Sequence, residues 1–357
     1  MMNWIRSHTA QLGLAARICV AAVLTYGLCH MLRIERAEWA VLTSVIVMQA
    51  SVGAALKATV DRFVGSLGGA IWGVIVSVAM PHGDPVALGV ALAVALAPLA
   101  LLVAMKPAYR IAPVTAIILM LTPALPGTGV FETGLQRMLE IALGSAVALV
   151  VSLVIFPTRA HEALTNAAGR ALGLLANLTD MLGSGLVGKG DTAAFFRQHD
   201  QIRKAIALAE TIADEAAREK RINLTSAPDP LPICRTLRRI RHDMTMIGRA
   251  TPDPLPGDAA ALTPVTLAAI QAISIFLRET ADALASHEPP RSMVAVSDAI
   301  SAYVAAASAL RHDQTASGLS DDMIARIYGI GFAFEQLQRD LGDLVDRTQE
   351  FAVRRRR

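Results

Sequence analysis

Two arginines and a glutamate stand out in this 357-residue chain because each lies beside or within a long apolar stretch. Arg62 precedes Gly69 by seven residues, and Arg137 precedes Gly144 by the same number. Glu140 follows Arg137 by three residues, so the two side chains share a helix face and are expected to pair. A carboxylate in an apolar stretch costs free energy unless it meets a partner or a cavity. These residues point to attraction of an anion by the guanidinium groups, with proton transfer by Glu140 as a further option.

The arginines and glycines also have structural explanations. An arginine near a helix end reaches the membrane interface at little cost and anchors the helix there, so anchoring and function are equally favoured for both arginines. Gly65, Gly69 and Gly73 repeat every four residues, which is typical of closely packed membrane helices. These three glycines and Gly144 are therefore predicted to serve helix packing.

Uncharged polar residues gather in two shorter apolar runs. Thr43 and Gln49 lie in one run, whereas Thr115 and Thr122 lie in the other, seven residues apart and so on one helix face. We expect these four side chains to line the middle of a substrate path. A threonine hydroxyl in a membrane helix often bonds a carbonyl of its own helix instead, and that alternative is favoured.

Six apolar runs in the first half would have to position these residues. The runs are Leu12–Leu32, Trp39–Ala55, Phe63–Met80, Val86–Met105, Ile111–Leu125 and Leu135–Phe156. A membrane-spanning helix needs about 20 residues, and only the second and fifth runs fall at or below the lower limit. We predict an all-α membrane protein, with a six-helix transmembrane domain over residues 1–157 and a helical domain over residues 158–357.

The first three runs and the last three resemble each other. Ala40-Val-Leu-Thr43 corresponds to Ala112-Pro-Val-Thr115 in the short runs, and the Arg-to-Gly spacing recurs in the third and sixth. Three spans are an odd number, so the second copy must insert upside down. In secondary transporters built this way, the substrate site lies at the repeat interface beside short or interrupted spans. The path is therefore expected between the second, third, fifth and sixth spans.

The second half is predicted to be an antiparallel helical bundle that serves dimerisation or gating. Lysines and arginines in the loops of the first half favour cytoplasmic N- and C-termini, which places this bundle in the cytoplasm. Its six predicted helices are Arg159–Gly183, Thr192–Ile222, Pro232–Ala250, Thr263–His287, Arg291–His312 and Ser320–Arg354.

Two motifs of the second half are ambiguous. The segment Gly183–Lys189 matches most of a phosphate-binding loop, but a helix rather than a strand is expected before it. We therefore interpret it as a helix connection. A basic helix face follows, formed by Arg235, Arg238, Arg239 and His242. This face is expected to pair with acidic helices, or alternatively to contact anionic headgroups.

Composition argues against several function classes. The net charge is only +3, and the first half has no concentrated basic stripe, so a nucleic-acid partner is not expected. Cys19, Cys29 and Cys234 have neither disulfide-framework nor metal-ligand spacing. No catalytic motif is present, and we therefore expect no enzyme activity, no cofactor and no metal.

Two passages resemble a known family. Glu38-Trp-Ala-Val-Leu-Thr-Ser-Val-Ile-Val-Met-Gln-Ala-Ser51 and Arg62-Phe-Val-Gly-Ser-Leu-Gly-Gly69 are similar to the fusaric acid resistance protein family, of the aromatic acid exporter superfamily. The resemblance covers roughly residues 10–160. It implies efflux of aromatic or other organic acids across the inner membrane, a homodimer, and a periplasmic membrane-fusion protein as partner.

Two other functions stay open from the sequence. The first is a passive anion channel, since the plant aluminium-activated malate channels are related to this superfamily. The second is a membrane scaffold or sensor that does not transport and acts through its cytoplasmic bundle. The sequence names neither the transported acid nor the energy source.

Overall fold

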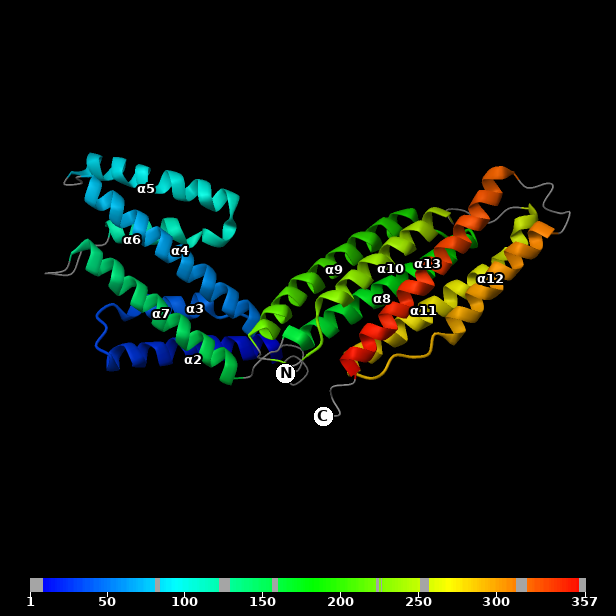
Figure 1. Ribbon diagram of the computed structural model, residues 1–357, viewed down its shortest axis with the longest axis horizontal. Helices are drawn as coiled ribbons and strands as arrows, with labels where there is room; N and C mark the ends of the chain where they lie inside the picture. Colours follow the sequence, from blue (N-terminus) through cyan, green and yellow to red (C-terminus); the bar gives the residue numbers. More distant parts are fainter. Residues whose placement is uncertain are drawn as a thin grey trace. The chain divides into compact units, whose positions relative to one another are not determined.

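The computed structural model describes residues 9–80, 84–121, 129–155, 160–222, 225, 227–250, 257–312 and 320–352. Within these ranges every regular element is a helix (Figure 1). The chain divides into two compact units, unit 1 from Met1 to Arg159 and unit 2 from Ala160 to Arg357. Each unit is considered by itself below.

Unit 1 repeats one pattern twice, in which a short helix lies between two long ones. Its helices are α2 (Thr9–Met31), α3 (Ala37–Val47), α4 (Val52–Ala79), α5 (Pro85–Met105), α6 (Ile111–Leu121) and α7 (Val130–Val154). The short helices α3 and α6 have 11 residues each, whereas α2, α4, α5 and α7 have 21 to 28.

Four helices of unit 1 are long and apolar enough to cross a membrane, namely α2, α4, α5 and α7. Helices α3 and α6 are apolar but too short, because 11 residues rise only about 16 Å against a hydrocarbon core of about 30 Å. A fifth candidate, Ala259–Ser286, lies in unit 2. These apolar helices fit a multi-pass membrane protein.

The second predicted run, Trp39–Ala55, is wrong in its bounds. Helix α3 ends at Val47, and α4 begins at Val52 because the Ser51 side chain accepts a hydrogen bond from the backbone N–H of Ala54 at 3.1 Å. Residues 56–62, between the second and third predicted runs, are therefore helix.

Arg62 and Arg137, the two arginines of the predicted path, lie inside helices and not at their ends. Arg62 is ten residues beyond the first residue of α4, Val52. Arg137 is seven residues beyond the first residue of α7, Val130. Each arginine thus lies two to three turns inside its helix. Anchoring at the membrane interface is expected of an arginine near a helix end, so this position argues against anchoring as their role.

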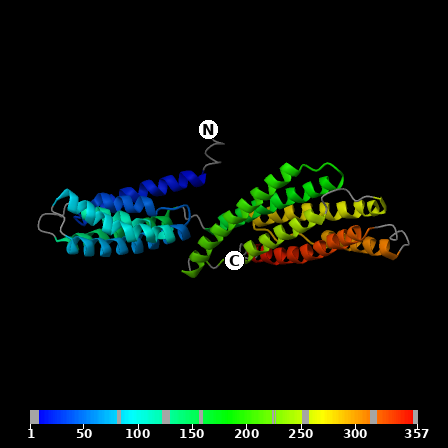
Figure 2. The same ribbon diagram turned by 90° about the horizontal axis from the view of Figure 1, so that it is seen from above.

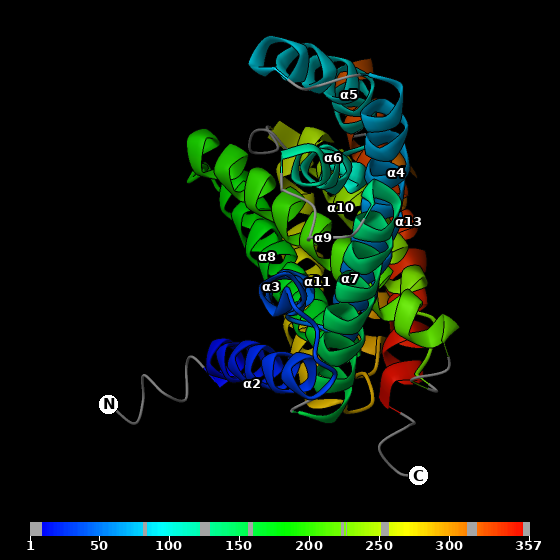
Figure 3. The same cartoon turned by 90° about the vertical axis from the view of Figure 1, so that its left-hand side faces the viewer.

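The short helices pack against the opposite triplet. Helix α3 packs on α7, α6 packs on α4, and α4 and α7 pack on each other. Helices α2 and α5 lie on opposite sides of this group of four (Figure 3). The crossings are close, since a Cβ atom added at Gly69 would overlap the carbonyl oxygen of Ala112, and one at Gly144 would overlap that of Ala40.

Unit 2 is a bundle of six helices that run alongside one another (Figure 2). They are α8 (Ala160–Leu186), α9 (Thr192–Arg221), α10 (Leu231–Ala250), α11 (Thr263–Ser286), α12 (Val294–His312) and α13 (Asp321–Ala352). The sequence predicts each of these helices, with bounds that differ by at most three residues. The cytoplasmic placement of the bundle stays a prediction.

Helix α11 is the long apolar helix of unit 2. One of its faces is buried in the bundle, whereas Gln271, Ile275 and Arg278 on the other face are exposed. It packs mainly on α8 and α12. Its buried Ser274 hydroxyl lies 3.3 Å from the Ala176 carbonyl of α8 and 2.5 Å from Asp180 Oδ1, so the contact with α8 includes polar groups.

The glycine-rich segment Gly183–Lys189 covers the last turn of α8, which ends at Leu186, and the start of the connection to α9. In that connection Gly188 adopts a φ of 73°, which favours glycine. The interpretation as a helix connection is confirmed.

Candidate functional site

Arg62 carries a buried positive charge whose hydrogen-bond partner is neutral. Its side chain lies on α4 and is only 6% exposed. Its Nε and Nη2 donate to Thr43 Oγ1 on α3, at 3.2 and 3.0 Å. The Thr43 hydroxyl in turn donates to the Trp39 carbonyl at 2.8 Å. No acidic side chain in the described ranges forms an ion pair with Arg62.

Arg137 has an acidic partner in its own helix. Its Nη1 lies 3.1 Å from Glu140 Oε2, and the two residues are 6% and 4% exposed. The guanidinium carbon also lies 4.0 Å from the ring centroid of Trp39, a cation–π contact from α7 to α3. The ion pair expected from the i, i+3 spacing is therefore present.

Thr115 links the two triplets. Its hydroxyl lies 3.2 Å from Ser66 Oγ on α4 and 3.2 Å from the carbonyl of Ile111, one turn earlier in α6. Like Thr43, it thus bonds its own helix and reaches a second one. The favoured alternative, a hydroxyl bonded to a carbonyl of its own helix, is therefore present at both positions, and their place in a substrate path stays a prediction.

These contacts converge on four helices, α3, α4, α6 and α7. We call this group the polar seam, formed by Trp39, Thr43, Arg62, Ser66, Thr115, Arg137 and Glu140. The seam holds two guanidinium groups and one carboxylate, and Arg137 acts on Arg62 as a like charge. With all three ionised, it has one excess positive charge, which suits an anion.

Two predicted site residues are not part of this convergence. Gln49 lies between α3 and α4, and its Nε2 donates to the carbonyl of Ile46 at 3.2 Å. In the described part of the chain, the Gln49 side chain forms no hydrogen bond with a seam residue. Thr122 lies outside the described residues.

The glycines predicted to serve packing lie at helix crossings. A Cβ atom added at Gly65 would lie 3.6 Å from the Ile111 Cβ, and one at Gly73 would lie 3.2 Å from the Ala116 Cα. With Gly69, they form a continuous line of close contact between α4 and α6. This contact brings Ser66 within reach of α6.

A small cavity lies at one end of the seam. It is lined by Arg36, Trp39, Ile118, Leu119, Thr133, Gln136, Arg137 and Glu140, and has a volume of about 20 Å³. That volume holds about one water molecule. An organic acid therefore does not fit in this cavity.

Arg17 is a buried charged residue that the predicted path omits. It lies in α2, is 2% exposed, and donates from Nη2 to the Ala50 carbonyl at 3.0 Å. Its Nε and Nη1 have no partner in the described part of the chain. A lone arginine within the apolar run Leu12–Leu32 was the available signal. Ser66 and Trp39 gave no such signal, since their roles depend on which helices cross.

The described ranges contain no group of three or more His, Cys, Asp or Glu side chains placed to hold a metal ion. A comparison with curated proteins found no match. Residues 20–151 match the family described as fusaric acid resistance protein-like, which confirms over this range the family that the sequence resembles.

Proposed function

We propose that this protein exports a small organic anion, an aromatic acid or a related acid, and that the polar seam binds the anion on its way. The observation that carries the proposal is Arg62, a charge buried on α4 with a threonine as its hydrogen-bond partner. A buried charge without a counter-ion is costly. A substrate carboxylate would supply the missing negative charge and accept bidentate hydrogen bonds from the guanidinium.

Arg137 would act as the second contact for the same anion. Its partner Glu140 holds it while the seam is empty. A substrate carboxylate that reaches the seam competes with Glu140 for Arg137. Protonation of Glu140 would release Arg137 to the substrate, which is how proton movement would couple to binding.

Each short helix packs on a long helix of the opposite triplet, α3 on α7 and α6 on α4. This packing supports an inverted-repeat transporter with six helices. Helices α3 and α6 each have 11 residues and lie in matching positions. Short spans at matching positions mark the substrate site in such transporters. Opening toward one side would separate α3 from α4, and opening toward the other would separate α6 from α7.

The family resemblance supports the remaining features of this proposal. They are residence in the inner membrane, cytoplasmic N- and C-termini, a homodimer, and cooperation with a periplasmic membrane-fusion protein. In this arrangement unit 2 lies in the cytoplasm.

Transport in proteoliposomes tests the proposal. We expect Arg62→Gln and Arg137→Gln each to lower the initial rate of radiolabelled aromatic-acid transport roughly tenfold or more, since each removes a charge-assisted contact. Arg110→Gln, at an exposed arginine of unit 1 outside the seam, is the matched control and should transport at the wild-type rate.

Unchanged transport by both seam variants, at equal protein content, would exclude the seam from the path. Planar-bilayer recording separates the exporter from a passive channel, because steady unitary currents would require a continuous open pore.

A further inference from the structure

Helices α10 and α13 lie side by side in unit 2 (Figure 1). Side chains of both helices line a groove. The groove has a volume of about 950 Å³, which is at the upper end of the range for small-molecule sites. Its walls are Arg235, Arg238, Arg239, His242, Asp243, Met246, Arg249 and Ala250 from α10, and Gly329, Phe332, Ala333, Gln336 and Asp340 from α13. It belongs to neither the polar seam nor the proposed path.

The α10 wall is strongly basic, and its charges are only partly compensated. Arg238 pairs with Glu210 at 3.4 Å, and Arg239 pairs with Asp340 at 3.2 Å and also with Asp343. Arg235 and Arg249 form no ion pair within the described ranges. Both are exposed guanidinium groups that border a concave surface, which suits recognition of a carboxylate.

An apolar section adjoins Arg249. Met246 shares a helix face with Arg249, and Phe332 borders the groove from α13 with 66% of its surface exposed. A large exposed aromatic ring and a guanidinium that line the same groove offer a stacking surface and an anion partner together. His242 and Gln336 add hydrogen-bonding groups farther along.

Two buried carboxyl groups, Asp243 and Asp340, form the floor. Each residue is 4% exposed, and one oxygen of each, Oδ2, has no hydrogen-bond partner in the described part of the chain. Burial, together with hydrogen bonding to Asp340, raises the pKa of Asp243 to about 7. The other charged groups that act on Asp243 are Arg239 of its own helix and Arg339 of α13. A proton on Asp243 therefore removes one negative charge from the floor near neutral pH.

We propose that this groove binds a small amphipathic carboxylate, with its apolar body between Met246 and Phe332 and its carboxylate paired with Arg249. The basic wall and the exposed aromatic ring together define the ligand class. A cation would meet four arginines, whereas a purely apolar ligand would leave Arg235 and Arg249 without an ion-pair partner. The inference goes beyond the transport proposal and does not depend on it.

Calorimetric titration of the full chain, in nanodiscs of neutral lipid, with 2-naphthoate as probe tests the groove. We expect Arg249→Gln to weaken binding roughly tenfold, because a charge-assisted contact is lost. Phe332→Ala should weaken it several-fold. The neutral amide of the same ring should bind more weakly than the acid.

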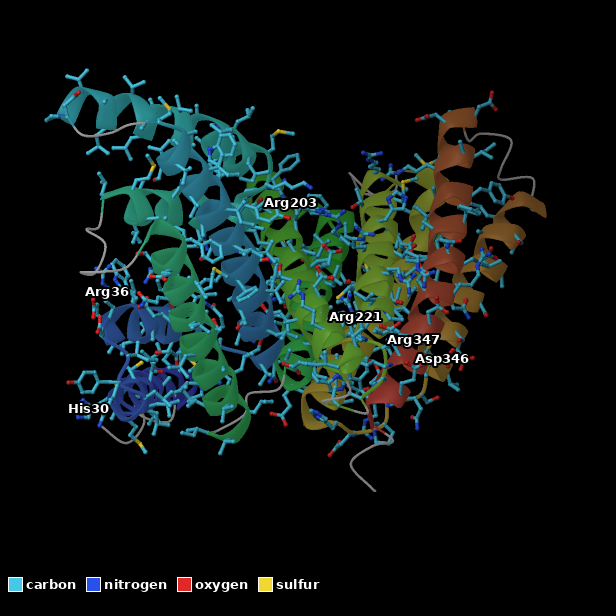
Figure 4. The ribbon with its side chains drawn as sticks, turned by 60° about the vertical axis from the view of Figure 1, so that its left-hand side comes forward. His30, Arg36, Arg203, Arg221, Asp346 and Arg347 are labelled. Atoms are coloured by element: carbon cyan, nitrogen blue, oxygen red, sulfur yellow. The ribbon has the colours of Figure 1, made fainter. Side chains whose placement is uncertain are left out.

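Arg221→Gln is the matched control, since Arg221 is exposed on α9 and outside the groove, as is Arg203 (Figure 4). It should leave the affinity unchanged. If both groove variants bind the probe with an affinity within roughly twofold of wild type, the proposal is overturned.

The two proposals fail separately. If Arg62→Gln and Arg137→Gln abolish naphthoate binding while Arg249→Gln does not, the groove proposal is wrong and the transport proposal stands. Loss of binding in Arg249→Gln alone supports the groove whatever the transport result. Adding anionic lipid to the nanodiscs identifies the source of the natural ligand. If the lipid competes with naphthoate for the groove, the ligand is a lipid carboxylate or phosphate. If it does not compete, the ligand is a soluble acid.

Discussion

Arg62 and Arg137 in unit 1 differ in how their positive charges are compensated. Arg137 has Glu140 and the Trp39 ring, whereas Arg62 has a threonine hydroxyl. Removing one partner of a buried ion pair costs several kcal/mol, because the other charge is left unpaired. The structure therefore separates an arginine that has a counter-ion from one whose hydrogen-bond partner is neutral, although both occupy the same position in the repeated sequence pattern.

At Asp243 the structure predicts a pH-dependent stability. Its folded pKa, about 7, lies above the ordinary value of about 3.9, so the native state binds more protons between these values. Stability therefore falls as pH rises from about 4 to 7 and is flat above that. We expect Asp243→Asn to gain about 1–3 kcal/mol relative to wild type between pH 5 and pH 8, measured by thermal unfolding followed by circular dichroism.

Asp200→Asn provides a control of opposite character. Asp200 accepts hydrogen bonds from Lys204 and Arg203, which lower its pKa, so it stays ionised across this pH range. Its variant should differ from wild type by the same amount at both pH values. Parallel profiles for Asp243→Asn and wild type would contradict the prediction.

Part of the seam is readable from the sequence. The i, i+3 spacing identifies the Arg137–Glu140 pair, because helix geometry alone brings these residues together. The bond from Arg62 to Thr43 and the stacking of Arg137 on Trp39 join different helices. Such contacts depend on which helices cross and at what rotation, and no local pattern encodes that.

Among the elements, the helices of unit 2 follow their sequence signals closely, whereas the α3–α4 junction does not. Proline-rich and glycine-rich breaks separate the amphipathic helices of unit 2. At the junction, apolar residues continue on both sides of Ser51, and hydropathy alone cannot locate a break within an apolar run. The cap at Ser51 was the available signal.

Close helix crossing predicts a strict requirement for glycine at position 69. Gly69→Ala would place a methyl group onto the Ala112 backbone, which cannot move aside as a flexible side chain can. We expect a loss of about 1–3 kcal/mol or more, seen as a lower melting temperature or loss of monodisperse protein in detergent. The neighbouring Gly68 meets nothing within 4 Å, so Gly68→Ala is the control. Equal behaviour of the two variants would refute the close crossing.

For the whole molecule, the packing of α3 and α6 against the opposite triplet makes the two triplets of unit 1 depend on each other. Helix α3 packs on α7, which begins 93 residues after the first residue of α3. Neither triplet therefore completes its own packing. A path formed by this arrangement uses residues from both halves of unit 1, as the polar seam does.

Membrane topology tests the inverted arrangement directly. Helix α5, Pro85–Met105, has the highest mean hydropathy of the candidate spans, 2.7. Reporter fusions at positions 83 and 108 should therefore report opposite compartments, with alkaline phosphatase active at 83 and green fluorescent protein fluorescent at 108. A fusion after residue 357 should behave like that at 108. The same compartment for 83 and 108 would exclude the inverted repeat.

The hydropathy of α11 bears on how the chain inserts into the membrane during its synthesis. The stretch Ala259–Ser286, which contains α11, has a mean hydropathy of 1.9, slightly above the 1.8 of Gln11–Met31 in α2, so the insertion machinery meets two segments of similar hydropathy. If α11 entered the bilayer, the segments after it would emerge on the far side from α8, α9 and α10. Helices α10 and α13 would then be separated by a membrane. If unit 2 lies in the cytoplasm, as proposed, α11 must therefore pack on α8 instead of inserting into the lipid.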